Sequence, residues 1–254
     1  MKIRYMFFVV WLALTIPSVS AVELRAAVAA NFLGTLQQLT QVYAEQTGHH
    51  IHLSSGSSGA LYAQIVNGAP FDLFFSADIE RAKALVDNDL ALEASRFTYA
   101  IGVPVLWSSK PDYLDDPVER LRTGSYRFLS ITDPRNAPYG VAAQQIFEHL
   151  GIWESLNRQG RLIRAQTITQ VYTQVASGAA ELGVVALAQL NQIQKDGVIP
   201  GSHWIPPAEW FTPIEQQAVI LKRATDADQA QQFMTWMRSP EAVKIIEEAG
   251  YALP

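Results

Sequence analysis

Short apolar runs alternate with amphipathic segments along most of the chain. Strand-like runs recur in six places: "ELRAAVAA", "HIHL", "FDLFFSA", "RFLSITDP", "LGVVAL" and "QQAVILK". Apolar residues at helical spacing occur in "FLGTLQQLTQVYAEQTG", "ALYAQIVNG", "IERAKALVDN", "GVAAQQIFEHLG", "ITQVYTQVASGAA" and "ALAQLNQIQKDG", and again in two segments near the end of the chain. This alternation predicts an α/β fold in which helices cover both faces of a mainly parallel sheet.

The strand and helix units fall into two blocks, and a further strand with two helices follows the second block. We therefore expect two lobes that are connected by more than one crossover. Lobe I comprises residues 22–101 plus 211–254, and lobe II comprises residues 102–210. Ligands of open α/β sheets bind beyond the carboxyl ends of the strands, so the expected site is the cleft between the lobes.

The first residues have a different pattern. Lys2 and Arg4 precede an apolar run from Met6 to Ile16, and small residues lead to Ala21. A basic start, a short apolar stretch and a small-residue exit are typical of a secretory signal peptide. A membrane anchor is the alternative, but the run is shorter than the ~20 residues that a transmembrane helix needs. We therefore expect residues 1–21 to be a cleaved signal peptide and the mature protein to be periplasmic.

Composition narrows the classes of function. The 254 residues are 49% hydrophobic and 17% charged, which is typical of a globular protein with a sizeable core. The formal net charge is −5, which argues against a nucleic acid as partner. The chain has no cysteine, so cysteine nucleophiles, thiolate metal sites and Fe–S clusters are excluded.

Four strand-to-helix junctions carry residues that are suited to the start of a helix. They are Asn31 in "VAANF", Ser57 and Ser58 in "SGSSG", Pro138 in "TDPRNAPYG", and the capping-box spacing from Thr167 to Gln170 in "AQTITQ". Asn31 is able to cap the helix that follows it. At the last junction, the Ile168 N–H is expected to be one of the unpaired donors of a helix start. Taken singly, each junction is explained by ordinary capping or turn formation.

Taken together, the junctions predict a binding site. Two come from each expected lobe, and all supply neutral N–H or O–H donors. If they face each other across a cleft, they enclose an oxyanion that has several acceptor oxygens and no proton. We expect Asp133 to be a turn residue and the Arg135 side chain to lie outside the direct contacts of the anion.

Five motifs spread over the expected mature chain carry a family resemblance: "AAVAANF", "SSGSSGALYAQI", "GAPFDLFFSAD", "DPRNAPYG" and "SPEAVKIIEEAGY". In these motifs the chain resembles the periplasmic molybdate-binding proteins of ABC importers. The resemblance implies a type II periplasmic-binding-protein fold that closes over molybdate or tungstate and delivers it to a membrane permease with its ATPase subunit. It also implies the oxyanion-binding residues, none of which contacts the metal atom directly: Ala30, Asn31, Ser58, Tyr139 and Ile168.

Two positions depart from the family pattern. Many members have serine in place of Asn31, and one branch has a ligating tyrosine where this chain has Ala186. Tyr139 is able to supply the missing phenol. The resemblance therefore leaves open whether Tyr139 donates to the anion through its backbone N–H or its hydroxyl.

Two alternative functions stay open on the sequence. The same fold could bind sulfate or another tetrahedral oxyanion, because sulfate and molybdate carry the same charge at neutral pH. The second alternative is an exported serine hydrolase that uses Ser57 or Ser58, although the chain has no G-x-S-x-G motif. We expect no cofactor, no enzyme activity and a monomeric state.

Overall fold

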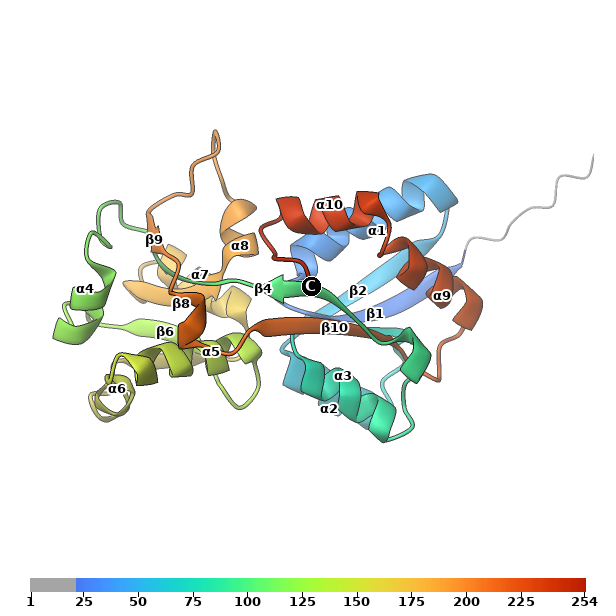
Figure 1. The fold of residues 1–254 in the computed structure, drawn as a ribbon, viewed down its shortest axis with the longest axis horizontal. Helices are drawn as coiled ribbons and strands as arrows, with labels where there is room; N and C mark the ends of the chain where they lie inside the picture. Colours follow the sequence, from blue (N-terminus) through green and yellow to red (C-terminus); the bar gives the residue numbers. More distant parts are fainter. Residues whose placement is uncertain (1–21) are drawn as a thin grey trace, which may run out of the picture.

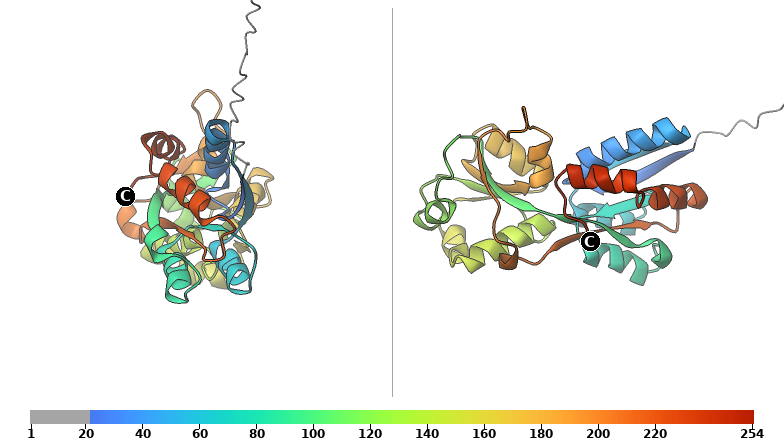
Figure 2. Two further views of the ribbon diagram at one scale, coloured as in Figure 1. Left: turned by 90° about the vertical axis from the view of Figure 1, so that its right-hand side faces the viewer. Right: turned by 45° about the horizontal axis from the view of Figure 1, so that its top comes forward.

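The computed structural model describes residues 22–254, and the expected signal peptide, residues 1–21, lies outside the described residues. Two five-stranded sheets form separate halves of the molecule, and helices cover both faces of each sheet (Figures 1 and 2). The predicted two-lobed α/β architecture is therefore confirmed.

The sheet of lobe I consists of β1 (Glu23–Ala29), β2 (His50–Gly56), β3 (Leu73–Ser76), β4 (Phe97–Gly102) and β10 (Ile214–Ile220). Their order across the sheet is β2-β1-β3-β10-β4. Strand β1 is parallel to both β2 and β3, whereas β10 is antiparallel to its two neighbours. The carboxyl ends of the parallel strands therefore meet at one edge of the sheet, where the predicted loops begin.

Helices cover the two faces of this sheet as the sequence predicts. Helices α1 (Leu33–Thr47), α9 (Ala227–Trp236) and α10 (Pro240–Glu248) pack on one face, and α2 (Ser58–Val66) and α3 (Ile79–Asp87) pack on the other. A short 3₁₀ turn, η1 (Glu93–Ser95), precedes β4.

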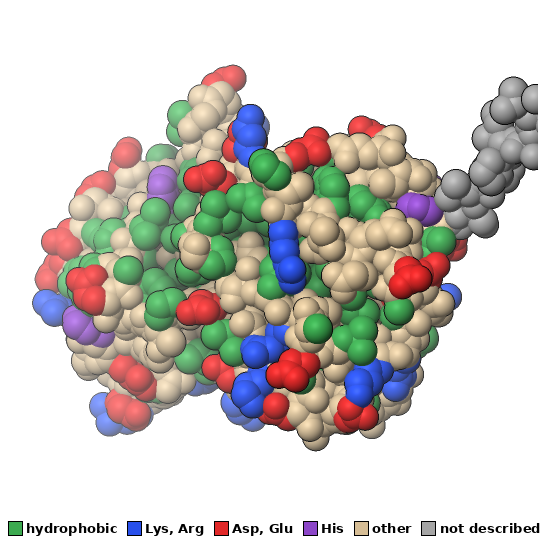
Figure 3. Space-filling model, turned by 45° about the vertical axis from the view of Figure 1, so that its right-hand side comes forward, with side chains coloured by type: hydrophobic (Ala, Val, Ile, Leu, Met, Phe, Trp, Pro, Cys, Tyr) green, Lys and Arg blue, Asp and Glu red, His purple; other side chains and the backbone are tan. Residues whose placement is uncertain are grey.

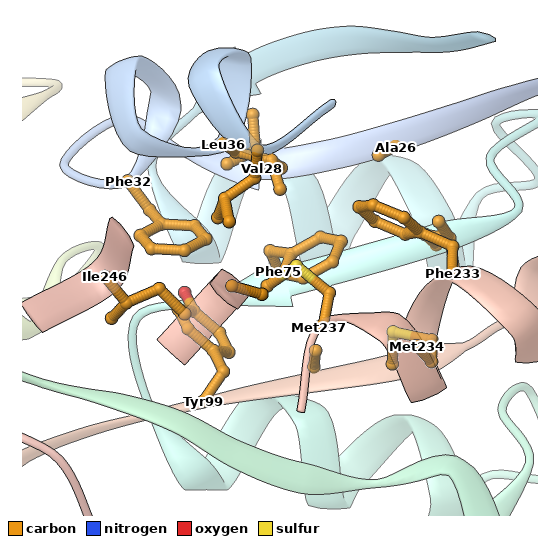
Figure 4. Packing of buried hydrophobic residues seen from close by; sticks show 14 of the residues in the cluster. Ala26, Val28, Phe32, Leu36, Phe75, Tyr99, Phe233, Met234, Met237 and Ile246 are labelled. Atoms are coloured by element: carbon orange, nitrogen blue, oxygen red, sulfur yellow. The ribbon is translucent and has the colours of Figure 1, made fainter. Parts of the chain in front are cut away.

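Aromatic rings fill the core of lobe I behind the end of β1. Phe32 is fully buried, and its ring centroid lies 4.4 Å from that of Tyr99 and 5.4 Å from that of Tyr251. Phe75 lies on the adjacent strand β3, and Figure 4 shows its ring grouped with those of Phe32 and Tyr99. This packing fixes the backbone just before α1.

Lobe II repeats the arrangement. Its strands are β5 (Pro104–Ser108), β6 (Leu129–Thr132), β7 (Leu162–Ala165), β8 (Leu182–Ala186) and β9 (Ser202–Trp204), in the order β7-β6-β8-β5-β9. Strand β6 is parallel to β7 and β8, and β5 is antiparallel to β8 and β9. One face is covered by α4 (Pro117–Thr123), α5 (Pro138–His149) and α6 (Trp153–Arg158), and the other by α7 (Ile168–Ala176) and α8 (Leu187–Asn191). The 3₁₀ turn η2 (Ala208–Trp210) follows β9.

Two chain segments connect the lobes (Figure 1). Strand β4 ends at Gly102 and continues through Val103 into β5, and the chain returns to lobe I where β10 begins at Ile214. Gly102 and Ile214 are partners in the β4–β10 ladder, so the two crossings lie side by side. Short paired connections of this kind let two lobes rotate about a shared hinge.

Two predicted elements differ at their ends. Strand β2 continues beyond "HIHL" to Gly56, so part of the serine–glycine stretch is strand and not loop. Helix α8 ends at Asn191, although the predicted helical segment continues to Gly197. The pairing of β2 with β1 over its whole length explains the first difference.

The surface of the described residues is mixed in character. On the face shown in Figure 3, acidic and basic side chains are interspersed and do not gather by sign. Among residues 22–254, no helix is both long enough and apolar enough to cross a membrane.

Candidate functional site

A small cavity lies where the two lobes meet, with a volume of about 20 Å³. It is lined by residues of both lobes: Ala29, Ala30, Asn31, Gly56, Ser57, Ser58, Ala77, Ala137, Pro138, Tyr139, Thr167 and Ile168. The structure thus brings together all five residues that the sequence nominated for binding. The cavity is far smaller than the ~300–1,000 Å³ of sites for drug-sized molecules, so it suits only a small ligand.

Helix α2 reaches the cavity with its first turn. Ser57 is the N-cap, and its Oγ accepts a hydrogen bond from the Ala60 N–H at 3.3 Å. Ser58 is the first helical residue, and its Oγ accepts from the Ala77 N–H at 2.9 Å. Because this bond uses an acceptor lone pair, the hydroxyl proton of Ser58 stays free to be donated to a ligand.

The predicted capping role of Asn31 is wrong. Helix α1 begins after Phe32 and has no side-chain cap. The amide Nδ2 of Asn31 instead donates to Oε1 of Gln216 at 2.7 Å, and the Tyr251 hydroxyl donates to the Asn31 carbonyl at 2.6 Å. A buried partner on β10 thus outcompetes the local cap, and the Asn31 backbone is held in place at the cavity wall.

Ala30 contributes to the cavity wall through its position. It lines the cavity, but its backbone N–H donates to the carbonyl of Gly56 at 2.9 Å. This bond joins the ends of β1 and β2. Ala30 therefore shapes the wall and has no backbone donor to spare.

Two helices of lobe II also begin at the cavity. Pro138 is at the first position of α5, as predicted, and Tyr139 follows it. At α7, Thr167 is the N-cap, and its Oγ1 accepts from the Gln170 N–H at 3.3 Å. Ile168 is the first residue of α7, so the Thr167 cap is confirmed, whereas the Gln170 side chain accepts from the Gln166 N–H at 2.8 Å and does not complete a capping box.

The cavity lining combines free donors with electrical neutrality. Within residues 22–254, no hydrogen bond takes up the backbone N–H of Asn31, Ser58, Tyr139 or Ile168. Each of these lies at or next to the start of a helix, where the macrodipole is positive. None of the lining residues is acidic, basic or a histidine. Such an arrangement attracts an anion and offers it no counter-ion and no proton acceptor.

Arg135 and Asp133 pair with each other outside the cavity lining. The Arg135 side chain is 83% exposed, and its Nη2 lies 2.6 Å from Oδ2 of Asp133. Hydrogen bonding from this guanidinium is the main cause that lowers the pKa of Asp133. The Asp133 carbonyl accepts from the N–H groups of Asn136 and Ala137, which makes it a turn residue as predicted.

The lobes touch on both sides of the cavity, so the structure is a closed form. On one side, the Gly59 N–H of α2 donates to the Asn136 carbonyl of lobe II at 3.1 Å. On the other side, Nδ2 of Asn191 in α8 donates to the Ala249 carbonyl of lobe I at 3.1 Å. A larger cleft of about 720 Å³ adjoins the cavity between α3 and α5, and Arg135 lies there.

The serine residues do not form a nucleophilic site. The Oγ atoms of Ser57 and Ser58 accept hydrogen bonds from the backbone, as described above. Among the hydrogen bonds of the described part of the chain, none joins either hydroxyl to a histidine. A serine nucleophile needs such a base within hydrogen-bond reach.

Residues behind the cavity were missed by the sequence reasoning. Gln216 is fully buried in β10, and its Oε1 also accepts from the Tyr99 hydroxyl at 3.1 Å. The signal was present in "EQQAVILK", because two glutamines at the start of an apolar strand are unusual unless each finds a partner.

Comparison with known proteins gives a consistent picture. Residues 24–252 match the family described as bacterial extracellular solute-binding protein. A molybdate-binding protein, ModA, of Azotobacter vinelandii is 40% identical over 92% of this chain and 91% of its own length. The ModA protein of Rhodobacter capsulatus is 39% identical over 94% of this chain and 92% of its own length.

Solved structures agree with these relatives. The periplasmic molybdate-binding protein of Azotobacter vinelandii superposes with a TM-score of 0.88 and 52% identity, covering 91% of this chain and 99% of that one. The sulfate-binding protein SubI of Mycobacterium tuberculosis, at 18% identity and a TM-score of 0.68, shares the fold alone; the match covers 91% of this chain and 86% of that one. The molybdate-binding relatives are solute-binding proteins and not enzymes. With a family match over almost all of its described length, this chain belongs to the bacterial extracellular solute-binding proteins.

Proposed function

We propose that the protein captures molybdate, and also tungstate, and delivers the anion to the membrane permease and ATPase subunit of an ABC importer. The observation that carries the proposal is the meeting of four helix beginnings, two from each lobe, at one buried cavity without a charged side chain. The molybdate-binding relatives at 40% and 39% identity support this choice of anion.

Five donors hold the anion in this proposal. They are the backbone N–H groups of Asn31, Ser58, Tyr139 and Ile168 and the hydroxyl of Ser58. A dianion that leaves water without a salt partner needs a full set of aligned donors, because each missing one leaves an ionic acceptor unsatisfied. The positive ends of the helix dipoles add to the attraction. Ala30 completes the wall.

Capture proceeds by closure of the lobes. The open form exposes a half-site on each lobe, and the anion bridges the two half-sites. The fraction of closed molecules then rises, because the anion binds the closed form more tightly than the open form. We assign residues 22–101 plus 211–254 to lobe I and residues 102–210 to lobe II; the ends of β4 and β10 support this division. We expect a monomer, and we expect the permease to bind the closed pair of lobes.

Export belongs to the same proposal. The pattern of residues 1–21 supports a signal peptide, and the Azotobacter vinelandii neighbour is named as periplasmic. The mature protein then meets its anion in the periplasm.

Titration calorimetry tests the choice of anion. We expect the mature protein to bind molybdate and tungstate more tightly than sulfate, because donors fixed for the larger anion lie too far from the oxygens of the smaller one. Phosphate is expected to bind weakly, since it keeps a proton near neutral pH and the cavity lining offers no acidic group to accept it. A preference for sulfate would overturn the proposal in favour of the sulfate-binding alternative.

Replacing Ser58 by alanine tests the side-chain donor. A hydrogen bond to a charged acceptor contributes about 1.5–3 kcal/mol, so we expect Ser58→Ala to weaken molybdate binding by roughly 10- to 100-fold. Calorimetry measures the change. Ser55→Ala is the matched control, because that hydroxyl is exposed on β2 and does not line the cavity. Equal affinities for the two variants would remove the Ser58 hydroxyl from the donor set.

A further inference from the structure

The phenol of Tyr139 lies against Gly102 at the hinge. A Cβ atom built on Gly102 would lie 3.0 Å from Cζ of Tyr139 and closer still to its hydroxyl oxygen. The same Cβ would lie 2.9 Å from Nε2 of Gln216. Gly102 and Gln216 are both absent from the cavity lining. The Tyr139 hydroxyl thus reaches a place outside the cavity lining.

That place is the pair of crossings between the lobes. Gly102 ends β4 and Gln216 lies near the start of β10, and these strands pair with each other there. Tyr139 belongs to α5 of lobe II and packs in one buried cluster with Ile214, the first residue of β10. Its side chain therefore bridges from lobe II to both hinge strands.

Space, and not backbone strain, requires glycine at position 102. Gly102 is not among the glycines of residues 22–254 that have a positive φ, so its backbone conformation is open to any residue. A methyl group at this position would overlap the Tyr139 hydroxyl. Because the phenol is rigid and completely buried, it has no room to move aside while the lobes are closed.

The contact also buries two polar atoms. In the described residues, the hydroxyl of Tyr139 and Nε2 of Gln216 are both buried without a hydrogen bond of good geometry. Burial is the main cause that raises the pKa of Tyr139, and the nearby Gln216 and Asn31 side chains lower it to a smaller extent. Burying such groups without good partners is unfavourable, so this contact opposes closure unless something else stabilises the closed form.

We propose that Tyr139 couples anion capture to the hinge. Gly102 is the positioning residue, because it leaves the space that the phenol occupies when α5 packs against the hinge strands in the anion-bound form. The inference rests on the proposed function, since the anion is what stabilises this form. When the anion binds the Tyr139 N–H, the start of α5 is drawn against β4 and β10. A side chain at position 102 holds α5 back and displaces the N–H donor.

A double-mutant cycle tests the coupling on the mature protein with molybdate as the probe. We expect Gly102→Ala to weaken molybdate binding by about tenfold or more, as overpacking at a rigid contact does. In the Tyr139→Phe background, which lacks the overlapping oxygen, the same substitution is expected to weaken binding less, although Cζ of residue 139 and Nε2 of Gln216 still lie close to the new methyl group. The melting temperature of each ligand-free variant shows whether the substitution has damaged the fold.

Small-angle scattering measures the closure of the lobes, which a substitution that only lowers stability would not change. Saturating molybdate is expected to reduce the radius of gyration of the wild type fully and that of Gly102→Ala only in part, with recovery in the double variant. If Gly102→Ala binds molybdate as the wild type does, or if its loss is equal in both backgrounds, the coupling is overturned and the proposed function stands. If the wild type itself does not bind molybdate, the proposed function fails and the coupling with it.

Discussion

Replacing Ile168 by proline is expected to weaken molybdate binding by roughly 10- to 100-fold, the loss that one hydrogen bond to a charged acceptor accounts for. Proline removes the backbone N–H and leaves the carbonyl and the rest of the helix unchanged. Ile168 is the first residue of α7, the position where helices accept proline most readily. Thr167 already has φ −135° and ψ 157°, which is the extended conformation that a following proline requires.

The control keeps the donor and removes the side chain. Ile168 is almost fully buried, so Ile168→Pro also deletes apolar contacts. Ile168→Ala deletes them as well but retains the N–H. The difference between the two variants in calorimetry therefore measures the donor alone. Equal affinities would show that the anion does not use this N–H, and the five-donor arrangement would have to be abandoned.

Replacing Phe32 by alanine is expected to lower the free energy of unfolding by about 3–5 kcal/mol, as the loss of a fully buried ring usually does. The ring packs against Tyr99 and Tyr251 in the aromatic core that Figure 4 shows in part. Phe32 also follows Asn31 directly, so the space left by the missing ring lets the backbone that carries the Asn31 N–H move. Chemical denaturation measures the stability, and we expect weaker molybdate binding in addition.

Phe233→Ala separates the two effects. Phe233 is also fully buried in the core of lobe I, but it lies on α9 and packs against Tyr43 at a centroid distance of 5.0 Å. Both variants should lose similar stability. Only Phe32→Ala should lose affinity at temperatures where both are folded. If the two lose affinity equally, the effect comes from general destabilisation and not from the Asn31 backbone.

Much of the fold follows from the sequence because the local signals agree with one another. The apolar runs that became β3 and β8 are buried at every position, and the helices around them begin at recognisable caps such as Asp78 and Thr167. The start of β10 was harder to predict, since its polar residues are paired with groups more than a hundred positions away in the chain. The spacing of apolar residues along the chain does not reveal such long-range pairs.

The site shows the same limit at the level of single residues. Ser58 and Ile168 could be nominated because helix starts have local rules. The orientation of the Asn31 side chain could not be predicted, because it could either cap the next helix or bond to a distant residue. The fold places Gln216 within hydrogen-bond distance, and the Asn31 amide bonds to it. The phenol of Tyr139 is a similar case, since only the closed arrangement of the lobes shows that Gly102 lies against it.

The path of the chain through the two lobes sets an order of assembly. Lobe II is one uninterrupted stretch, whereas the sheet of lobe I has β10 between β3 and β4, and its core includes α9 and α10 from the end of the chain. Because synthesis begins at the N-terminus, the chain can complete lobe II while lobe I still lacks a central strand. The Asn31 carbonyl at the cavity wall gains its hydrogen-bond partner, the Tyr251 hydroxyl, only after the last residues of the chain have arrived.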